Sequence, residues 1–186
     1  MRNHRLGALV GTGVTIITVA VVSAVPASAA NATATLTGAG SPAILSSTTP
    51  SWSQTLDGLD HIGLSTTANV DVNDATGTGS GWNLTLSGAV LTSGSHTLGQ
   101  PSTNAAATFS SCDTNSTCTL PTSNTGAGAV SYPFSVATSA AKFYSANANT
   151  GLGRMTGTNT WLINVYANSF AGTYTGAWVY SIISGP

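Results

Sequence analysis

Residues 79–88 read G-S-G-W-N-L-T-L-S-G, and this stretch decides the fold class of the chain. A glycine-rich turn runs into Trp82, and Leu84 and Leu86 follow at alternate positions. Apolar residues at every second position after a Gly/Ser cluster are typical of a β-strand, and they place the three side chains on one face. The pattern leaves three roles open for Trp82: a core residue, an exposed binding ring, or a mixture of both.

Similar patterns recur along the chain, whereas the 3.6-residue periodicity of helices is nearly absent. Pro133 places part of one candidate strand at a sheet edge. Strands are expected within residues 34–38, 52–64, 68–72, 82–86, 105–111, 127–136, 141–146, 160–166 and 172–183. About nine to eleven short strands without helices predict an all-β domain, either a β-sandwich or a partly closed barrel.

The N-terminal segment has the pattern of a secretory signal peptide. Basic residues at 2–5 precede an apolar run over 6–25, and the small residues A-S-A-A follow at 27–30. Cleavage is expected after position 29 or 30. The alternative is an uncleaved membrane anchor, because the apolar run approaches the length of a membrane span. No later apolar stretch reaches that length, so we expect no transmembrane segment after cleavage.

The remainder, residues 31–186, has the length of one domain. Its charges are Lys142 and Arg154 against five aspartates, a net charge near −3, and glutamate is absent. Two cations cannot neutralise a run of phosphates, which argues against nucleic acid as a partner. The chain has four Trp, five Tyr and four Phe, and disordered chains are poor in such residues. These features predict an exported, soluble, folded domain.

Cys112 and Cys118 enclose the polar segment C-D-T-N-S-T-C. In an exported protein, a lone close pair of cysteines favours a disulfide at a loop tip. Free thiols are the alternative. A metal site would need more ligands nearby, and no His or second Cys pair is close in the sequence.

Candidate catalytic residues are few. Asp57 with Asp60 and Asp71 with Asp74 are the close carboxylate pairs, and both stand beside turn-forming residues, which favours structural roles. Residues 71–79 superficially resemble a calcium loop but lack its bidentate glutamate. No G-x-S-x-G elbow is present. We therefore expect no catalytic residue, no cofactor and no metal.

Five segments together resemble the WxL domain, a family of exported Gram-positive surface proteins named for two Trp-x-Leu motifs. Within the first segment, the Asp, Gly, Gly, Trp and Leu at positions 74, 77, 81, 82 and 84 fall as the family has them. The segments are V-D-V-N-D-A-T-G-T-G-S-G-W-N-L-T-L at 70–86, S-A-N-A-N-T-G-L-G at 145–153, N-T-W-L-I-N-V at 159–165, A-G-T-Y-T-G at 171–176 and Y-S-I-I-S-G-P at 180–186. The resemblance covers most of residues 34–186 and is weakest around the cysteine loop.

The second motif departs from the family. With Tyr174 and Pro186 aligned, it falls on Tyr180-Ser181-Ile182, which keeps an aromatic-x-aliphatic pattern without Trp or Leu. Trp161 and Trp178 are nearby in the sequence, yet neither has leucine two positions later.

The resemblance implies a non-catalytic surface domain held non-covalently on peptidoglycan, in association with a membrane-tethered WxL-interacting protein. On that basis the expected cell-wall or partner-binding residues are Trp82, Leu84, Tyr180, Ile182, Trp178 and Trp161. Trp82 and Tyr180 should lie close together, with the aliphatic members as buried supports. Two other functions stay open: a structural or adhesin-type subunit that assembles with itself or a partner, and a glycan-active enzyme.

Overall fold

A computed structural model describes residues 33–186, so the expected signal peptide lies outside the described residues. The chain divides into two units, residues 1–35 and 36–186, and the second unit holds every strand described below. The described residues form eleven strands and no helix, and they include no helix able to span a membrane.

The strands vary from two to fourteen residues in length. Their bounds are β1 Ala43–Ser47, β2 His61–Asp74, β3 Trp82–Gly88, β4 Thr92–Ser93, β5 His96–Thr97, β6 Ser102–Thr103, β7 Thr108–Cys112, β8 Phe134–Ser135, β9 Ala141–Ser145, β10 Gly153–Val165 and β11 Trp178–Ser184.

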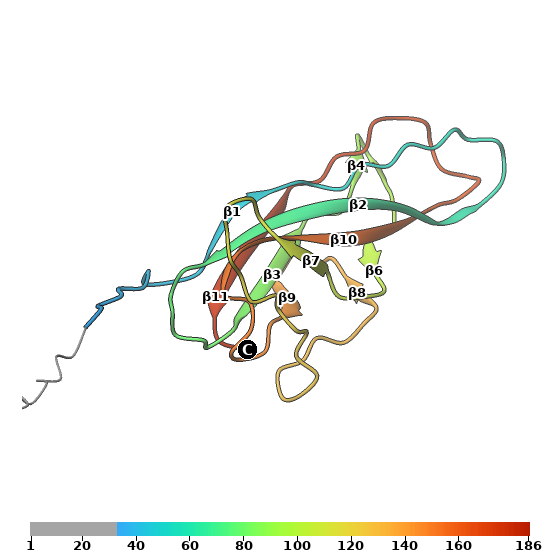
Figure 1. The fold of residues 1–186 in the computed structure, drawn as a ribbon. Helices are drawn as coiled ribbons and strands as arrows, with labels where there is room; N and C mark the ends of the chain where they lie inside the picture. Colours follow the sequence, from blue (N-terminus) through green and yellow to red (C-terminus); the bar gives the residue numbers. More distant parts are fainter. Residues whose placement is uncertain (1–32) are drawn as a thin grey trace, which may run out of the picture. The chain divides into compact units, whose positions relative to one another are not determined.

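The strands form two principal antiparallel sheets and one small hairpin (Figure 1). The larger, six-stranded sheet has the order β1-β2-β10-β6-β8, and β7 pairs with another part of β10. The smaller sheet has the order β11-β3-β9, and β4 pairs with β5. The larger sheet does not close on itself. The expected all-β fold is therefore confirmed as a sandwich and not as a barrel.

The core lies between the two sheets. Val70, Val72 and Met155 from the larger sheet are buried together with Leu84 and Leu86 from the smaller one. The alternation over residues 68–72 and 82–86 therefore identified real core faces. Burying such side chains contributes about 1.5–3 kcal/mol each relative to leaving them in water.

Aromatic rings fill the rest of the core in two clusters. One cluster joins Trp82, Phe109 and Tyr144, with ring centroids 5.2–5.6 Å apart. The other gathers around Trp161 and Phe143, whose centroids are 6.1 Å apart. Such pairs add about 0.5–1.5 kcal/mol beyond the area they bury.

Gly157 shows why one glycine stands inside the long strand β10. It is opposite Phe109 of β7, and a Cβ at this glycine would lie 2.4 Å from the Phe109 ring. The absent side chain therefore lets the ring lie directly against the strand.

Several strand expectations were wrong in detail. Residues 34–38 form no strand, and 127–136 contribute only β8. Residues 52–60 are irregular because their apolar side chains have no regular period. The sequence A-I-L-S-S of β1 was missed because it does not alternate, and β4, β5 and β6 are too short to show a period.

Candidate functional site

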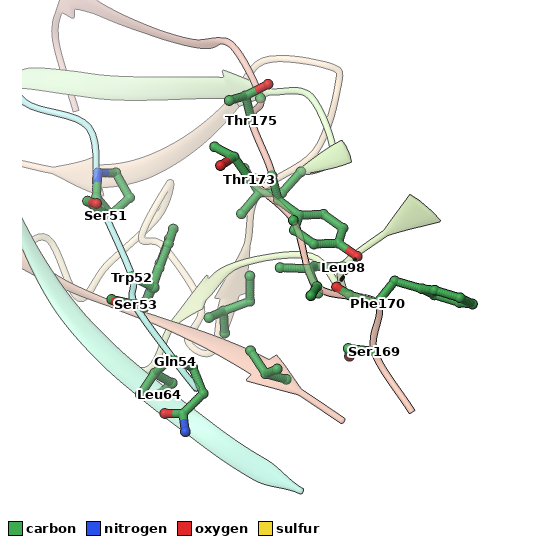
Figure 2. A pocket seen from close by; sticks show the side chains of 18 of the residues that line it. Ser51, Trp52, Ser53, Gln54, Leu64, Leu98, Ser169, Phe170, Thr173 and Thr175 are labelled. Carbon is green, nitrogen blue, oxygen red and sulfur yellow. Dashed lines mark hydrogen bonds between the residues drawn. The ribbon is translucent and has the colours of Figure 1, made fainter. Parts of the chain in front are cut away.

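A cleft of about 850 Å³ lies at one end of the sandwich. It is bounded by two irregular segments, 49–56 and 169–176, and its base is formed near the start of β2 and the end of β10 (Figure 2). The side chains of Leu91 and Leu98, on either side of the β4–β5 hairpin, complete the lining. The volume is within the range of about 300–1,000 Å³ typical of small-molecule sites.

The floor of the cleft is aliphatic. Ile163 and Val165 are buried at the end of β10, and Leu64 of β2 is half-buried beside them. Ile163 is opposite Leu64 in the strand register, so both side chains lie on the same face of the sheet. The floor is thus continuous with the core, and Leu64 is its most accessible side chain.

The walls carry aromatic rings and hydroxyl groups. Trp52, Tyr174 and Trp178 are half-buried in the lining, whereas Figure 2 shows the Phe170 side chain pointing away from the cleft. The Tyr174 hydroxyl donates to the Phe170 carbonyl at 2.9 Å, which fixes the second wall segment. The polar lining residues are Thr49, Ser51, Ser53, Gln54, Thr55, Ser169, Thr173 and Thr175.

No charged residue lines this cleft. A ligand would therefore be held by dispersion against the rings and floor, and by hydrogen bonds to hydroxyl and amide groups. An ionic ligand would lose hydration without gaining a counter-charge. The lining chemistry selects an uncharged ligand.

Trp82, the residue whose role the sequence left open, is a core residue. Its side chain is 0% exposed, and its indole Nε1 donates to the Gly151 carbonyl at 2.9 Å. Gly151 has a φ of +75°, and a Cβ there would lie 2.4 Å from Nε1. The missing side chain at Gly81 likewise leaves room for the backbone carbonyl of Ala146 and not for a ligand. The expectation that Trp82 presents its ring to a ligand is thus replaced by a buried packing role.

Leu84 and Trp161 are also 0% exposed, so neither reaches the surface. The expected burial of Leu84 is confirmed. Trp161 was expected in the binding set, but its position in the middle of β10 turns its ring into the core, where it meets Trp178 at 4.9 Å.

The two aromatic-x-aliphatic triplets lie on neighbouring strands. β11 pairs with β3 so that Leu84 is opposite Ile182, while Trp82 is opposite Ser184 and Tyr180 is opposite Leu86. The triplets therefore meet through their aliphatic members. Their aromatic rings join different clusters.

Tyr180 packs with Phe143 at 5.7 Å and with Trp178 at 6.5 Å. Burial raises the pKa of the Tyr180 phenol to about 12. Ile182 is half-buried against the core. Of the six residues expected to bind, Trp178 is the one that lines the cleft.

The aspartates hold the backbone and other side chains in place. Asp57 accepts from the Leu59 amide at 3.0 Å and Asp74 from the Thr76 amide at 3.0 Å, so both have the expected turn role. A hydrogen bond from His61 lowers the pKa of the Asp57 carboxyl.

Asp60 and Asp71 differ from the expected turn role. Asp60 accepts from the amide of Ala167 at 2.8 Å and so joins the two ends of β2 and β10. Asp71 lies within β2 and pairs with Arg154 at 2.7 Å. Arg154 also contacts Asp113 at 2.9 Å, beside the cysteine loop.

Cys112 and Cys118 form the expected disulfide. Within residues 33–186, no three side chains of the His, Cys, Asp or Glu types gather in a way that would hold a metal ion. The 71–79 segment uses Asp71 and Asp74 for the contacts described above.

The cleft itself was not predicted from the sequence. Its walls come from two Ser/Thr-rich stretches, each with one aromatic residue that lies in the cleft, Trp52 and Tyr174. Their composition is typical of ordinary loops. The signal that distinguishes them is the presence of aromatic residues among the Ser and Thr residues of each stretch.

Comparison with models of protein families, with curated proteins and with solved structures found no match to this chain.

Proposed function

We propose that the chain is an exported, non-catalytic cell-surface domain that binds peptidoglycan non-covalently, with the cleft as its glycan-binding site. The observation that carries the proposal is the uncharged lining, which combines aromatic rings, an aliphatic floor and hydroxyl-bearing walls. The resemblance of residues 70–86 and the later segments to the WxL domain supports the cell wall as the place of action.

The chemistry of an N-acetylated glycan matches this lining. The apolar face of a sugar ring can stack on Trp52 or Trp178, and acetamido methyl groups can rest on the floor at Leu64. Sugar hydroxyls can exchange hydrogen bonds with the Ser, Thr and Gln54 side chains of the walls. Such a site would hold the sugar strand and leave the charged parts of the wall outside.

The non-catalytic part of the proposal is supported by the carboxylates. Glycoside hydrolysis usually requires two of them beside the scissile bond. None of the chain's aspartates lines the cleft, and each is engaged with a backbone amide or with Arg154.

A second function, assembly with another protein, is favoured by a separate observation. Five of the exposed large apolar side chains lie in the segments around the cleft, namely Leu56, Leu59, Ile62, Tyr166 and Phe170. Exposed apolar side chains gathered at one place are typical of protein contact sites. The partner could be the membrane-tethered protein that the WxL resemblance implies or a second copy of the chain.

The proposal is tested by sedimentation of the secreted protein with purified peptidoglycan, and by titration with a soluble N-acetylglucosamine oligomer. Thr173→Arg places a long charged side chain in the exposed wall without disturbing the core, and should abolish binding of both probes. Val179→Arg is the matched control, because Val179 is 59% exposed on β11 outside the lining. Equal binding by the two variants would contradict the assignment of the cleft.

A further inference from the structure

The segment T-A-T-L-T at residues 33–37 has the pattern of a strand but no sheet to join. Threonine alternates with Ala34 and Leu36, and threonine favours strands. Residues 33–41 are nevertheless all exposed and form no strand, and Leu36 is 91% exposed. Any contact that removes such an exposed leucine side chain from water is favourable in free energy.

The cleft offers what this segment lacks. Its floor is aliphatic, and its walls are lined with hydroxyl groups. In the described chain, residues 51–56 and 170–174 make no hydrogen bond from backbone to backbone. The Phe170 and Thr55 carbonyls accept from side chains of their own segments. The other amides and carbonyls can pair with an added strand, and alternate side chains of that strand can face the floor.

Neither partner carries charge. The segment 33–37 has none, and the cleft lining has none. Insertion would therefore leave no ionised group desolvated and unpaired, which is the main obstacle to burying a polar peptide.

Leu36 cannot reach the floor of the cleft in its own molecule. The amide of Ala39 donates to the Ala75 carbonyl at 2.8 Å, which fixes this part of the chain next to the C-terminal end of β2. The cleft is at the opposite end of β2, beside Leu64. Ten residues of strand from Leu64 to Asp74 span about 33 Å, whereas five residues extend at most about 18 Å.

We propose that residues 33–37 of one copy insert as a strand into the cleft of a second copy, with Leu36 on the aliphatic floor. Because the donor and acceptor surfaces are different, the contact is head-to-tail and repeats from copy to copy. The insertion uses the same cleft as the proposed glycan site, so glycan and donor strand exclude each other. It does not depend on any affinity of that cleft for glycan.

The test uses two variants of the secreted protein, each defective on one side of the contact. Leu36→Asp removes the donor side chain and leaves the cleft intact, whereas Thr173→Arg blocks the cleft and leaves the donor intact. Sedimentation velocity over a concentration series should show assembly of the wild type and monomers for each variant alone. An equimolar mixture of the two variants should give one-to-one pairs and nothing larger.

Leu45→Asp is the matched control, because Leu45 is also an exposed leucine but lies outside the donor and the cleft. It should assemble as the wild type does. A synthetic peptide of residues 33–38 should bind the Leu36→Asp protein, and the same peptide with Asp in place of Leu36 should bind at least about tenfold more weakly, which corresponds to about 1.4 kcal/mol.

A wild-type protein that stays monomeric at concentrations on the order of 1 mM, where even contacts of about −4 kcal/mol would be visible, overturns the proposal. Assembly that Leu36→Asp leaves unchanged also overturns it. Failure of the N-acetylglucosamine oligomer to bind the Leu36→Asp protein, whose cleft is intact and holds no donor strand, would contradict the glycan function alone. If the N-acetylglucosamine oligomer binds but the protein never assembles, the result would contradict this inference alone.

Discussion

Replacing Trp82 by alanine should remove a large part of the free energy of unfolding of the domain and leave the cleft intact. The side chain is 0% exposed and packs at 5.6 Å from Phe109 and 5.5 Å from Tyr144. Removing a buried Trp side chain costs about 3–5 kcal/mol through lost transfer energy and the cavity left behind. The Gly151 carbonyl would also lose its donor, which adds about 1–3 kcal/mol unless water enters.

Trp82→Phe separates the two contributions, because it keeps a large ring and removes the indole N–H. Its expected loss is about 1–3 kcal/mol, mainly from the unpaired Gly151 carbonyl. Equilibrium urea unfolding followed by circular dichroism measures the free energy of unfolding of both variants, against a total of about 5–15 kcal/mol for a domain. Sedimentation with peptidoglycan measures binding of the folded fraction.

Tyr166→Ala provides the control, because Tyr166 is 47% exposed and should change the free energy of unfolding by no more than about 0.5 kcal/mol. The reasoning is refuted if Trp82→Ala loses less than about 1 kcal/mol of stability while its folded fraction binds the wall more weakly. That outcome would mean that the ring acts at a surface.

Three further predictions concern the disulfide, salt and pH. Replacing Cys112 and Cys118 by serine should lower the free energy of unfolding by about 2 kcal/mol through the lost loop constraint, measured by urea unfolding, and should leave peptidoglycan binding unchanged. Raising NaCl from about 0.05 to about 0.5 M should change peptidoglycan binding less than about threefold, because no charge lines the cleft; a steep loss would indicate a basic patch or a bridging cation. Burial raises the pKa of Tyr132 and Tyr180 to about 12 and also raises that of Tyr144, so the free energy of unfolding should be fully kept below pH 10 and should fall between about pH 10 and 12, where the unfolded chain ionises first; an unfolding free energy that is constant over this range would contradict the burial of these phenols.

The sequence predicted the strands that have a clear period and missed those that do not. Ala68, Val70 and Val72 alternate with polar residues and lie in the core of β2. The sequence A-I-L-S-S of β1 shows no alternation, because an edge strand with one half-buried residue needs none. Residues 34–38 show the opposite case, a strand pattern without a partner in the same molecule.

The candidate site could be predicted only in small part. Trp178 was expected to bind and does line the cleft. Trp82 and Trp161 were also expected to bind, but the structure buries both side chains in the core. A period of two tells which side chains share a face, but not which face meets the other sheet. The cleft is formed by two irregular segments, 49–56 and 169–176, which are far apart in the sequence. No local sequence pattern predicts that such segments will lie side by side.

The pairing of β2 with β10 determines when the chain can fold. His61 pairs with Val165 and Asp74 with Gly153. The longest strand, β2, can therefore pair with β10 only after the last quarter of the chain is present. β3 likewise finds both of its neighbours, β9 and β11, only after residue 140. Domains built on such distant pairings fold in milliseconds to seconds, far more slowly than helical bundles. While the chain emerges gradually, β1 can pair only with the C-terminal part of β2. The rest of β2 and the whole of β3 stay unpaired until the C-terminal strands arrive, and these are the segments that a chaperone or a protease would meet first.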